Sequence, residues 1–189
     1  MYVLPLHVEE LLKLGFSRDP LARMRTLHPR YFDFFDCRHA VVVETDRVRE
    51  ARAIETALKR RLRDHRAAAP PEIAASAGGD SEWFRGASTL IDTEIAALED
   101  GGYRVHRGSS GWLRDQVLAR SAELFESSAQ ALEQIGLARS EDELRARAVL
   151  STRLRDALDA LVAFEIDVAN AVPAQVDDWY RAGANTTDP

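Results

Sequence analysis

Residues 13–27 (KLGFSRDPLARMRTL) carry side chains whose types and spacing suit chemistry on a phosphate. A short apolar run ends at Gly15, and a turn then leads into helical spacing that carries Arg23 and Arg25. A guanidinium held beside such a turn can bind a phosphate group through charge-assisted hydrogen bonds. The same two arginines could equally be solvated surface charges. This segment alone leaves both interpretations open.

A second segment places a carboxylate at a core-facing position. Ala51, Leu58 and Leu62 share one face of an expected helix, and Glu55 lies on that face between them. A buried charge without a partner is costly, so Glu55 needs a reason to be there. It could pair with Lys59 one helical turn later, or it could face a site and bind a cation.

Charge is distributed unevenly along the chain, whose net charge is -6 over 189 residues. Residues 1–66 hold 14 Lys and Arg against 10 Asp and Glu, whereas residues 67–189 hold 11 against 21. The first part can meet a polyanion that the second part would repel. Basic side chains of the first part that could follow a nucleic-acid backbone, or form only a solvated face, are Arg18, Arg25, Lys59, Arg60 and Arg63.

Composition limits the class of protein. With 46% apolar residues the chain can bury one sizeable core, or form one compact domain with a helical appendage. The single cysteine, Cys37, excludes an intrachain disulfide and fits a reducing compartment. No stretch approaches the roughly 18 apolar residues of a membrane span, and no signal-peptide pattern is present. We expect a cytoplasmic protein without a membrane partner, although secretion through a signal-less apparatus would leave the same pattern.

The elements expected to position these residues begin with a hairpin. Apolar runs at residues 2–6 and 11–16 predict two antiparallel strands, which would bring Tyr2 beside the second strand. Asp19 suits a helix N-cap and Pro20 the first helical position, so a helix is expected over residues 20–28.

A small sheet and further helices are expected to follow. The run 34–45 predicts a strand whose residues 40–43 are so continuously apolar that it would be central. Asp46 could cap a helix that runs to about Arg66. Trp83 and Phe84 could fill the core or stack on bases. The other elements expected here are loops over 28–31 and 67–80, a strand over 82–84 and a helix from 88 that ends at 101–102.

The remainder is expected to be helical. Apolar spacing predicts a long helix over 112–135 with Gly136 as its stop, and residues 140–143 form a capping box for a second helix that Pro173 would end after Val172. Joined by a short loop, these helices would form an antiparallel hairpin. The hairpin could cover its own apolar stripes, form a homodimer or receive a protein partner. Residues 176–189 are expected to be frayed.

Five short motifs follow one another over about the first 100 residues. They are Tyr2-Val3-Leu4, Lys13-Leu14-Gly15-Phe16-Ser17, Pro20-Leu21-Ala22-Arg23-Met24, Ala53-Ile54-Glu55-Thr56-Ala57-Leu58 and Glu82-Trp83-Phe84. Their order and spacing resemble the GIY-YIG nuclease superfamily, in particular the branch of phage-encoded and meiotically up-regulated members with a K-I-G-Y-S/T second strand and a closing E-W-F.

The resemblance implies a fold, an activity and a set of site residues. The fold would be α+β, with a small mixed sheet flanked by helices over residues 1–102, followed by a C-terminal helical hairpin over 103–189. The activity would be hydrolysis of a phosphodiester of nucleic acid, with DNA expected, using one divalent metal, Mg²⁺ or Mn²⁺. Glu55 would be the metal ligand and Arg23 would bind the scissile phosphate. Tyr2 would orient or deprotonate the attacking water.

The sequence departs from the superfamily's pattern at three site positions. Lys13 stands where the motif has its second tyrosine, and it could supply a cation near Tyr2 without repeating the tyrosine's chemistry. Phe16 stands where the superfamily branch has an aromatic residue that carries a hydroxyl group. Lys59 stands where the superfamily often has a histidine, and it puts a cation near Glu55. Two functions are therefore compared, an active endonuclease and a catalytically weakened domain that binds nucleic acid or protein. A purely helical interaction protein is a third possibility, and it predicts no N-terminal hairpin.

Overall fold

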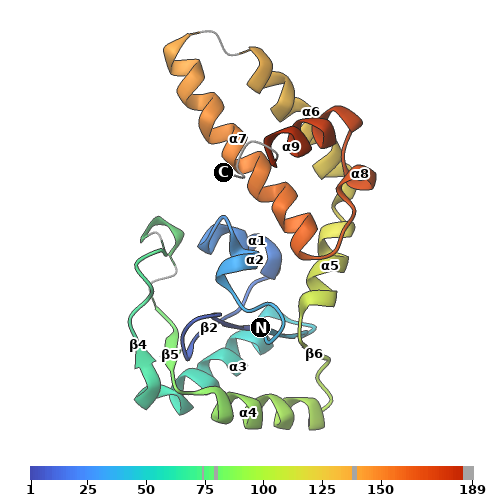
Figure 1. Ribbon diagram of the computed structural model, residues 1–189. Coiled ribbons are helices and arrows are strands. Elements are labelled where there is room, and N and C mark those ends of the chain that lie inside the picture. Colours follow the sequence, from blue (N-terminus) through green and yellow to red (C-terminus); the bar gives the residue numbers. More distant parts are fainter. Residues whose placement is uncertain (74, 79–80, 138–139, 185–189) are drawn as a thin grey trace. The chain divides into compact units, whose positions relative to one another are not determined.

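The computed structural model describes residues 1–73, 75–78, 81–137 and 140–184 (Figure 1). The chain separates into two compact units, residues 1–112 and 113–189, and each is described by itself. The domain boundary expected at residue 102 falls before the division at residue 112, and it would leave the last strand of the sheet outside the first unit. Every predicted site residue belongs to the first unit.

A six-stranded sheet in the described residues organises the first unit. Its order is β4-β5-β2-β1-β3-β6, and every pairing among these strands is antiparallel. The expected α+β class with helices flanking a small sheet is confirmed, and the sheet is antiparallel where a mixed one was expected. The strands are β1 (Tyr2–Pro5), β2 (Leu11–Gly15), β3 (Val41–Val43), β4 (Arg66–Ala67), β5 (Trp83–Arg85) and β6 (Val105–Arg107).

The β1–β2 hairpin lies at the centre of this sheet, as its almost completely buried residues require. Tyr2 is opposite Gly15 and Leu4 is opposite Lys13. Because side chains alternate between the two faces of a strand, Tyr2 and Lys13 point to the same face. The predicted hairpin is confirmed, which excludes a purely helical protein.

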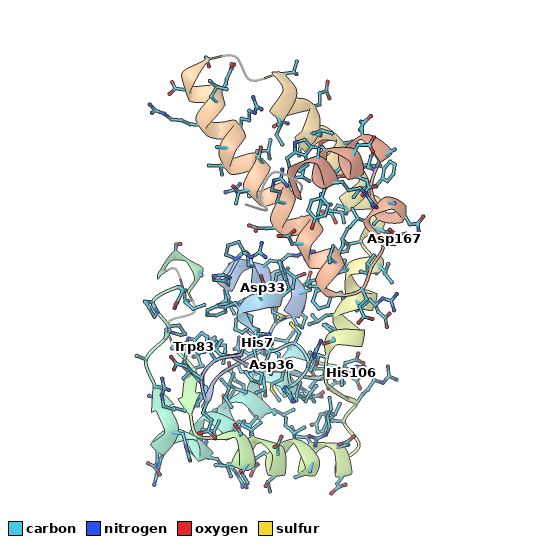
Figure 2. All side chains as sticks on the ribbon, viewed as in Figure 1. His7, Asp33, Asp36, Trp83, His106 and Asp167 are labelled. Carbon is cyan, nitrogen blue, oxygen red and sulfur yellow. The ribbon has the colours of Figure 1, made fainter. Side chains whose placement is uncertain are left out.

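Helices cover both faces of the sheet (Figure 1). Val3 and Leu14 belong to the core cluster that also contains buried residues of α3 (Val48–Arg61) and α4 (Ser88–Asp100). The opposite face is covered by α1 (Pro20–Leu27) and α2 (Tyr31–Phe34). Trp83 lies on this side (Figure 2), where its ring stacks on Phe35 with 6.5 Å between the ring centroids. Trp83 and Phe84 are thus core residues.

The start of α1 confirms the capping prediction. The Asp19 carboxylate accepts a hydrogen bond from the Ala22 amide at 3.0 Å, and Pro20 occupies the first helical position. Leu21, Met24 and Leu27 are buried, which directs Arg23 to the side of the apolar stripe.

The strand predicted over 34–45 is wrong in length and position. Only Val41–Val43 are in β3, which is one strand away from the sheet edge rather than central. Tyr31, expected in a loop, starts α2. The Asp36 carboxylate accepts hydrogen bonds from the amides of Arg38 and His39, and this turn interrupts the apolar run. Such hydrogen bonds are invisible to a pattern of hydrophobicity.

The helix predicted from Asp46 to Arg66 is also shorter than expected. Its N-cap is Arg47, without a side-chain hydrogen bond, and α3 ends at Arg61. A 3-10 turn, η1 (Arg63–His65), follows. Part of the predicted loop 67–80 has structure, because Ala67 pairs in β4 and residues 75–77 form a second 3-10 turn, η2. The prediction at residues 74, 79 and 80 lies outside the described residues.

The predicted helix 112–135 is two helices, α5 (Ser110–Leu118) and α6 (Ser121–Leu137). The Arg120 amide bonds to the Val117 carbonyl at 3.0 Å in the turn between them, and Gly136 lies inside α6 instead of ending it. Apolar spacing continues across the turn, so periodicity could not detect the break.

In the second unit, α6 and α7 (Glu141–Ala163) lie side by side as an antiparallel pair (Figure 1). The capping box of Ser140 and Glu143 is confirmed. The helix predicted to reach Val172 ends at Ala163, because Glu165 adopts a left-handed backbone with φ of 57° and a short helix, α8 (Val168–Ala171), follows.

The tail predicted to be frayed contains α9 (Ala174–Ala184). Tyr180 donates a hydrogen bond to Asp159 at 2.5 Å, and the Arg155 guanidinium lies 4.5 Å from the Trp179 ring centroid. The last part of that prediction, residues 185–189, lies outside the described residues. Leu154, Leu158 and Leu161 are buried, which agrees with a hairpin that covers its own apolar stripe. No described helix has both the length and the apolar character of a membrane span.

Candidate functional site

Four side chains from four elements lie close enough for their charges to influence one another. Tyr2 comes from β1, Lys13 from β2, Arg23 from α1 and Glu55 from α3. The charges of Arg23 and Glu55 both act on the Tyr2 hydroxyl and on the Lys13 ammonium. The structure therefore brings together the four residues to which the sequence assigned catalytic roles.

Tyr2 is buried against Gly15. A Cβ atom added to Gly15 would lie 2.6 Å from Cζ of the Tyr2 ring, so the ring occupies the space that any other residue would fill. Burial raises the pKa of the Tyr2 hydroxyl, the neighbouring Arg23 guanidinium opposes this shift, and the charges of Glu55 and Glu82 add to it. The phenol is protonated at neutral pH and can donate a hydrogen bond. The cation that acts on it is Arg23.

Arg23 reaches from α1 to the segment that contains η2. Its guanidinium donates hydrogen bonds to the carbonyl oxygens of Ala77 at 2.6 Å and Gly78 at 2.9 Å. Carbonyl oxygens are uncharged acceptors, and a phosphate oxygen is a stronger partner for a guanidinium. The backbone of residues 77 and 78 therefore occupies the Arg23 donors, and the same guanidinium acts on the Tyr2 hydroxyl.

Lys13 is buried, with 1% of the residue exposed. Its ammonium donates to the Ser81 carbonyl and pairs with a Glu82 carboxylate oxygen at 3.1 Å, while its Nζ lies 5.7 Å from the Trp83 ring centroid. Burial lowers the pKa of Lys13, and the ion pair with Glu82 opposes that shift. Glu82 thus compensates the buried charge of Lys13.

Glu55 is connected to Glu82 through Lys59. The Lys59 ammonium lies 3.1 Å from Oε1 of Glu82 and 3.6 Å from Oε2 of Glu55. The predicted pairing of Glu55 with Lys59 is confirmed, and the alternative that Glu55 binds a cation stays a prediction. Burial acts to raise the pKa of Glu82, but hydrogen bonds from Ser81, Lys13 and Lys59 lower it to about 2.

Sequence reasoning assigned no role to Glu82, which pairs with two lysines of the site. The signal was present in the Glu82-Trp83-Phe84 motif, but the direction of the carboxylate was not. Glu82 has a positive φ of 63°, a backbone conformation uncommon for glutamate, and its carbonyl accepts a hydrogen bond from the Leu14 amide at 3.0 Å. The carbonyl oxygens of Ala77 and Gly78 were missed as well, since any residue supplies a carbonyl.

Among the described residues of the site, the carboxylates of Glu55 and Glu82 are the groups that could hold a divalent cation. Within the described residues, no group of three or more His, Cys, Asp or Glu side chains is arranged to hold a metal. However, the Lys59 ammonium between two carboxylates marks a position where a cation is favourable. Mg²⁺ keeps several water ligands and is often bound through one or two carboxylates, so Glu55 could supply one such ligand.

The basic residues predicted to follow a nucleic-acid backbone lie in several parts of the first unit. Lys59 belongs to the site itself. Arg25 is exposed, with its guanidinium 5.8 Å from the Tyr31 ring centroid. Arg60 and Arg63 are exposed at the end of α3 and in η1, where Arg63 pairs with Asp64 at 3.4 Å.

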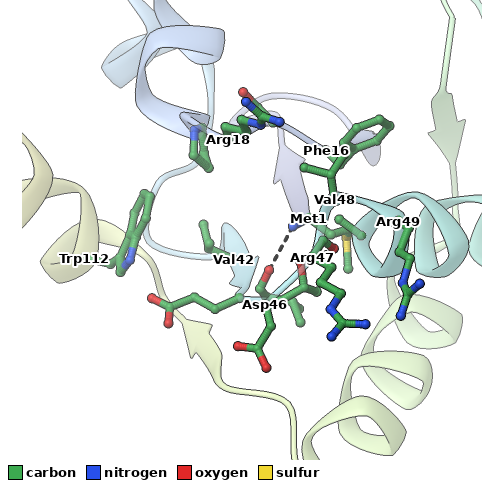
Figure 3. Close-up of a pocket in the computed structure, with 15 residues that line it drawn as sticks. Met1, Phe16, Arg18, Val42, Asp46, Arg47, Val48, Arg49 and Trp112 are labelled. Atoms are coloured by element: carbon green, nitrogen blue, oxygen red, sulfur yellow. Dashed lines mark hydrogen bonds between the residues drawn. The ribbon is translucent and has the colours of Figure 1, made fainter.

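Arg18 lines a cavity of about 940 Å³ in the first unit, next to Met1 and Phe16 (Figure 3). Arg47 and Arg49 also line it, and the Trp112 ring forms part of its wall on the other side. Glu44 at its edge is compensated by His106 at 2.9 Å and Arg104 at 3.3 Å. The cavity therefore combines arginines with aromatic surface.

A comparison with family models matches residues 1–136 to the T5orf172 domain, which is more than half of the chain. The chain belongs to the T5orf172 domain family. No curated protein and no solved structure matches it. The T5orf172 match contains every strand of the sheet and all four predicted catalytic residues. It also extends beyond the first 100 residues, through α5 and most of α6.

Proposed function

We propose that this T5orf172 protein is a metal-dependent endonuclease of the GIY-YIG type that hydrolyses phosphodiester bonds of nucleic acid, with DNA as substrate. The observation that carries the proposal is the convergence of Arg23, Tyr2 and Glu55 at the end of the β1–β2 hairpin. A guanidinium, a phenol and a carboxylate from three elements supply a phosphate-binding group, a hydrogen-bond donor for the nucleophile and a cation ligand.

Arg23 would bind the scissile phosphate. Its donors already bind two carbonyl oxygens, and a phosphate would replace them with charged oxygens. The guanidinium would also stabilise the negative charge that develops during hydrolysis, a contribution that is commonly worth about 10²–10³ in rate for one donor.

Tyr2 would orient the attacking water. A raised pKa keeps the phenol protonated, which favours orientation by hydrogen bonding over removal of the water's proton. The close packing of its ring on Gly15 would hold the hydroxyl in place.

Glu55 would hold the divalent cation, Mg²⁺ or Mn²⁺. When bound, such a cation lowers the pKa of coordinated water and offsets phosphate charge. Glu55 is 7% exposed, so its carboxylate sits where water competes little for the ion. The neighbouring Lys59 competes with a cation there and must be accommodated elsewhere.

The cleavage test uses supercoiled plasmid with Mg²⁺ or Mn²⁺ and purified protein. We expect the wild type to nick or linearise the plasmid, and Glu55→Gln and Arg23→Ala to lose about 100-fold or more of that activity. Glu50→Gln on the same helix and Arg38→Ala at an exposed position serve as matched controls that should cleave normally. Equal cleavage in all five proteins would show that the nuclease activity arises elsewhere.

A second candidate is a domain that binds nucleic acid without cleaving it. Two observations favour it, namely that Lys59 approaches Glu55 and that backbone carbonyls occupy the Arg23 donors. It predicts retention of a labelled DNA duplex in a mobility-shift assay, with no product in either metal. Arg23→Ala would then weaken retention, whereas Glu55→Gln would not.

A further inference from the structure

Three ionic groups, Glu55, Lys59 and Glu82, form a continuous chain in the site. Lys59 Nζ is closer to Glu82 Oε1, at 3.1 Å, than to Glu55 Oε2, at 3.6 Å. The side chain of Lys59 is 27% exposed and that of Glu82 25% exposed, so neither charge is fully screened by bulk water. The position of the ammonium depends on both carboxylates.

Glu82 is anchored, whereas Lys59 can move. The other oxygen of the Glu82 carboxylate pairs with Lys13, which is buried in β2, and the Glu82 backbone bonds to Leu14. Lys59 instead ends a flexible four-carbon stem on the surface of α3. A small rotation of that stem would transfer its ammonium fully to Glu82.

From this geometry we propose that Glu82 is a positioning residue for the cation site: it takes up the Lys59 ammonium and so leaves the Glu55 carboxylate free to bind a divalent metal. This inference rests on the proposed metal-dependent function. It assigns Glu82 an action through Lys59 and not as a metal ligand.

The charge balance explains why a second carboxylate is required. Lys13 and Lys59 together carry two positive charges, and Glu55 and Glu82 carry two negative ones, so the four groups are neutral before a metal binds. Without Glu82 the group would carry a net positive charge, and Lys59 would have Glu55 as its nearest carboxylate. Both effects would oppose the entry of a divalent cation.

The test measures Mn²⁺ affinity directly, by isothermal titration calorimetry and by the electron paramagnetic resonance signal of free Mn²⁺. Four proteins form a double-mutant cycle: the wild type, Glu82→Gln, Lys59→Met and the double variant. The variant Glu55→Gln shows whether the measured Mn²⁺ binding depends on the Glu55 carboxylate. Glu94→Gln is the matched control, since Glu94 pairs with Arg61, another basic residue of α3, at 2.5 Å.

We expect Glu82→Gln to weaken Mn²⁺ binding about 10-fold, the lower end of the usual effect of groups that support a metal ligand. Lys59→Met should bind Mn²⁺ more tightly than the wild type. In the Lys59→Met background, Glu82→Gln should weaken binding less than it does in the wild-type background, because the ammonium that Glu82 holds is absent and only the change in net charge remains. Lys13 loses its partner in both backgrounds, so this loss cancels when the effect of Glu82→Gln is compared between them. Thermal unfolding monitors the fold of each variant.

Each other outcome overturns the inference in a distinguishable way. Equal weakening by Glu82→Gln in both backgrounds would show that Glu82 acts on the metal directly, as a ligand or through its charge, and not through Lys59. Binding that needs Glu55 but does not respond to Glu82→Gln would reject the positioning role while leaving the proposed function intact. A wild type that binds no Mn²⁺ would reject both proposals.

Discussion

Replacing Gly15 by alanine should displace Tyr2 and is the sharpest test of how the site is built. Gly15 has no positive φ that would require glycine, so its backbone can accept an alanine. The added Cβ would lie 2.6 Å from Cζ and 2.9 Å from Cε2 of the Tyr2 ring. The substitution thus tests one contact, the packing of the ring over the hairpin.

The size of the effect follows from these distances. Ordinary carbon contacts begin at 3.4 Å, and the Tyr2 hydroxyl oxygen is even closer to the added Cβ than Cζ is, so the ring must move by at least about 0.8 Å. Tyr2 has little room for this movement because it is 2% exposed. Overpacking of this kind costs about 1–3 kcal/mol of unfolding free energy. A displacement near 1 Å in an active site can cost about 10²-fold in rate, so cleavage should fall by a comparable factor if Tyr2 orients the nucleophile.

The assays are urea unfolding followed by circular dichroism, and plasmid cleavage. Gly136→Ala is the control, because Gly136 lies inside α6 and an added Cβ there meets no atom within 4 Å. That substitution should stabilise the protein by about 0.5–1 kcal/mol, the usual gain from alanine in a helix. The reasoning fails if Gly15→Ala is as stable as the wild type, or if it is destabilised yet cleaves at the wild-type rate.

Three further predictions concern capping, pH and nucleic-acid contact. Asp19→Ala should lower the unfolding free energy by about 1 kcal/mol, measured by urea unfolding, because the Ala22 amide loses its acceptor, whereas Asp19→Asn should retain most of it. The pKa of Glu82 is lowered from 4.5 to about 2, so its stabilising effect is full above pH 4.5 and disappears as the pH falls toward 2. The stability advantage of the wild type over Glu82→Gln should shrink over that range, and a constant difference would contradict the assigned ion pairs. Arg18→Ala should weaken DNA binding and reduce its salt dependence by about one phosphate contact, measured by fluorescence anisotropy at several salt concentrations. An unchanged salt dependence would remove Arg18 from the contact surface.

Local rules predicted those parts of the fold where the deciding interactions lie within a few residues. The hairpin of β1 and β2, the Asp19 cap of α1, and the capping box of Ser140 and Glu143 all belong to this class. The core-facing position of Glu55 is similar, because helical periodicity alone places it beside Ala51 and Leu58.

Local rules were wrong where an element ends for a reason outside the hydrophobic pattern. The strand expected over 34–45 is interrupted by a turn at Asp36, and the long C-terminal helix stops at the left-handed backbone of Glu165. In both places apolar residues continue with suitable spacing, since buried side chains are needed whether or not the backbone is regular.

The sequence by itself determined which groups the site could contain. Tyr2, Arg23 and Glu55 could be named as candidates from residue type, spacing and resemblance, together with the helix start that presents Arg23. Only the tertiary structure decided how their charges are balanced. Glu82 is 27 positions from Glu55 in the chain, yet it meets Lys13 and Lys59 because β5 pairs with β2 and its backbone turns through a positive φ. Ion pairs act across space over a few ångströms, and that proximity is set by strand order and not by spacing along the chain.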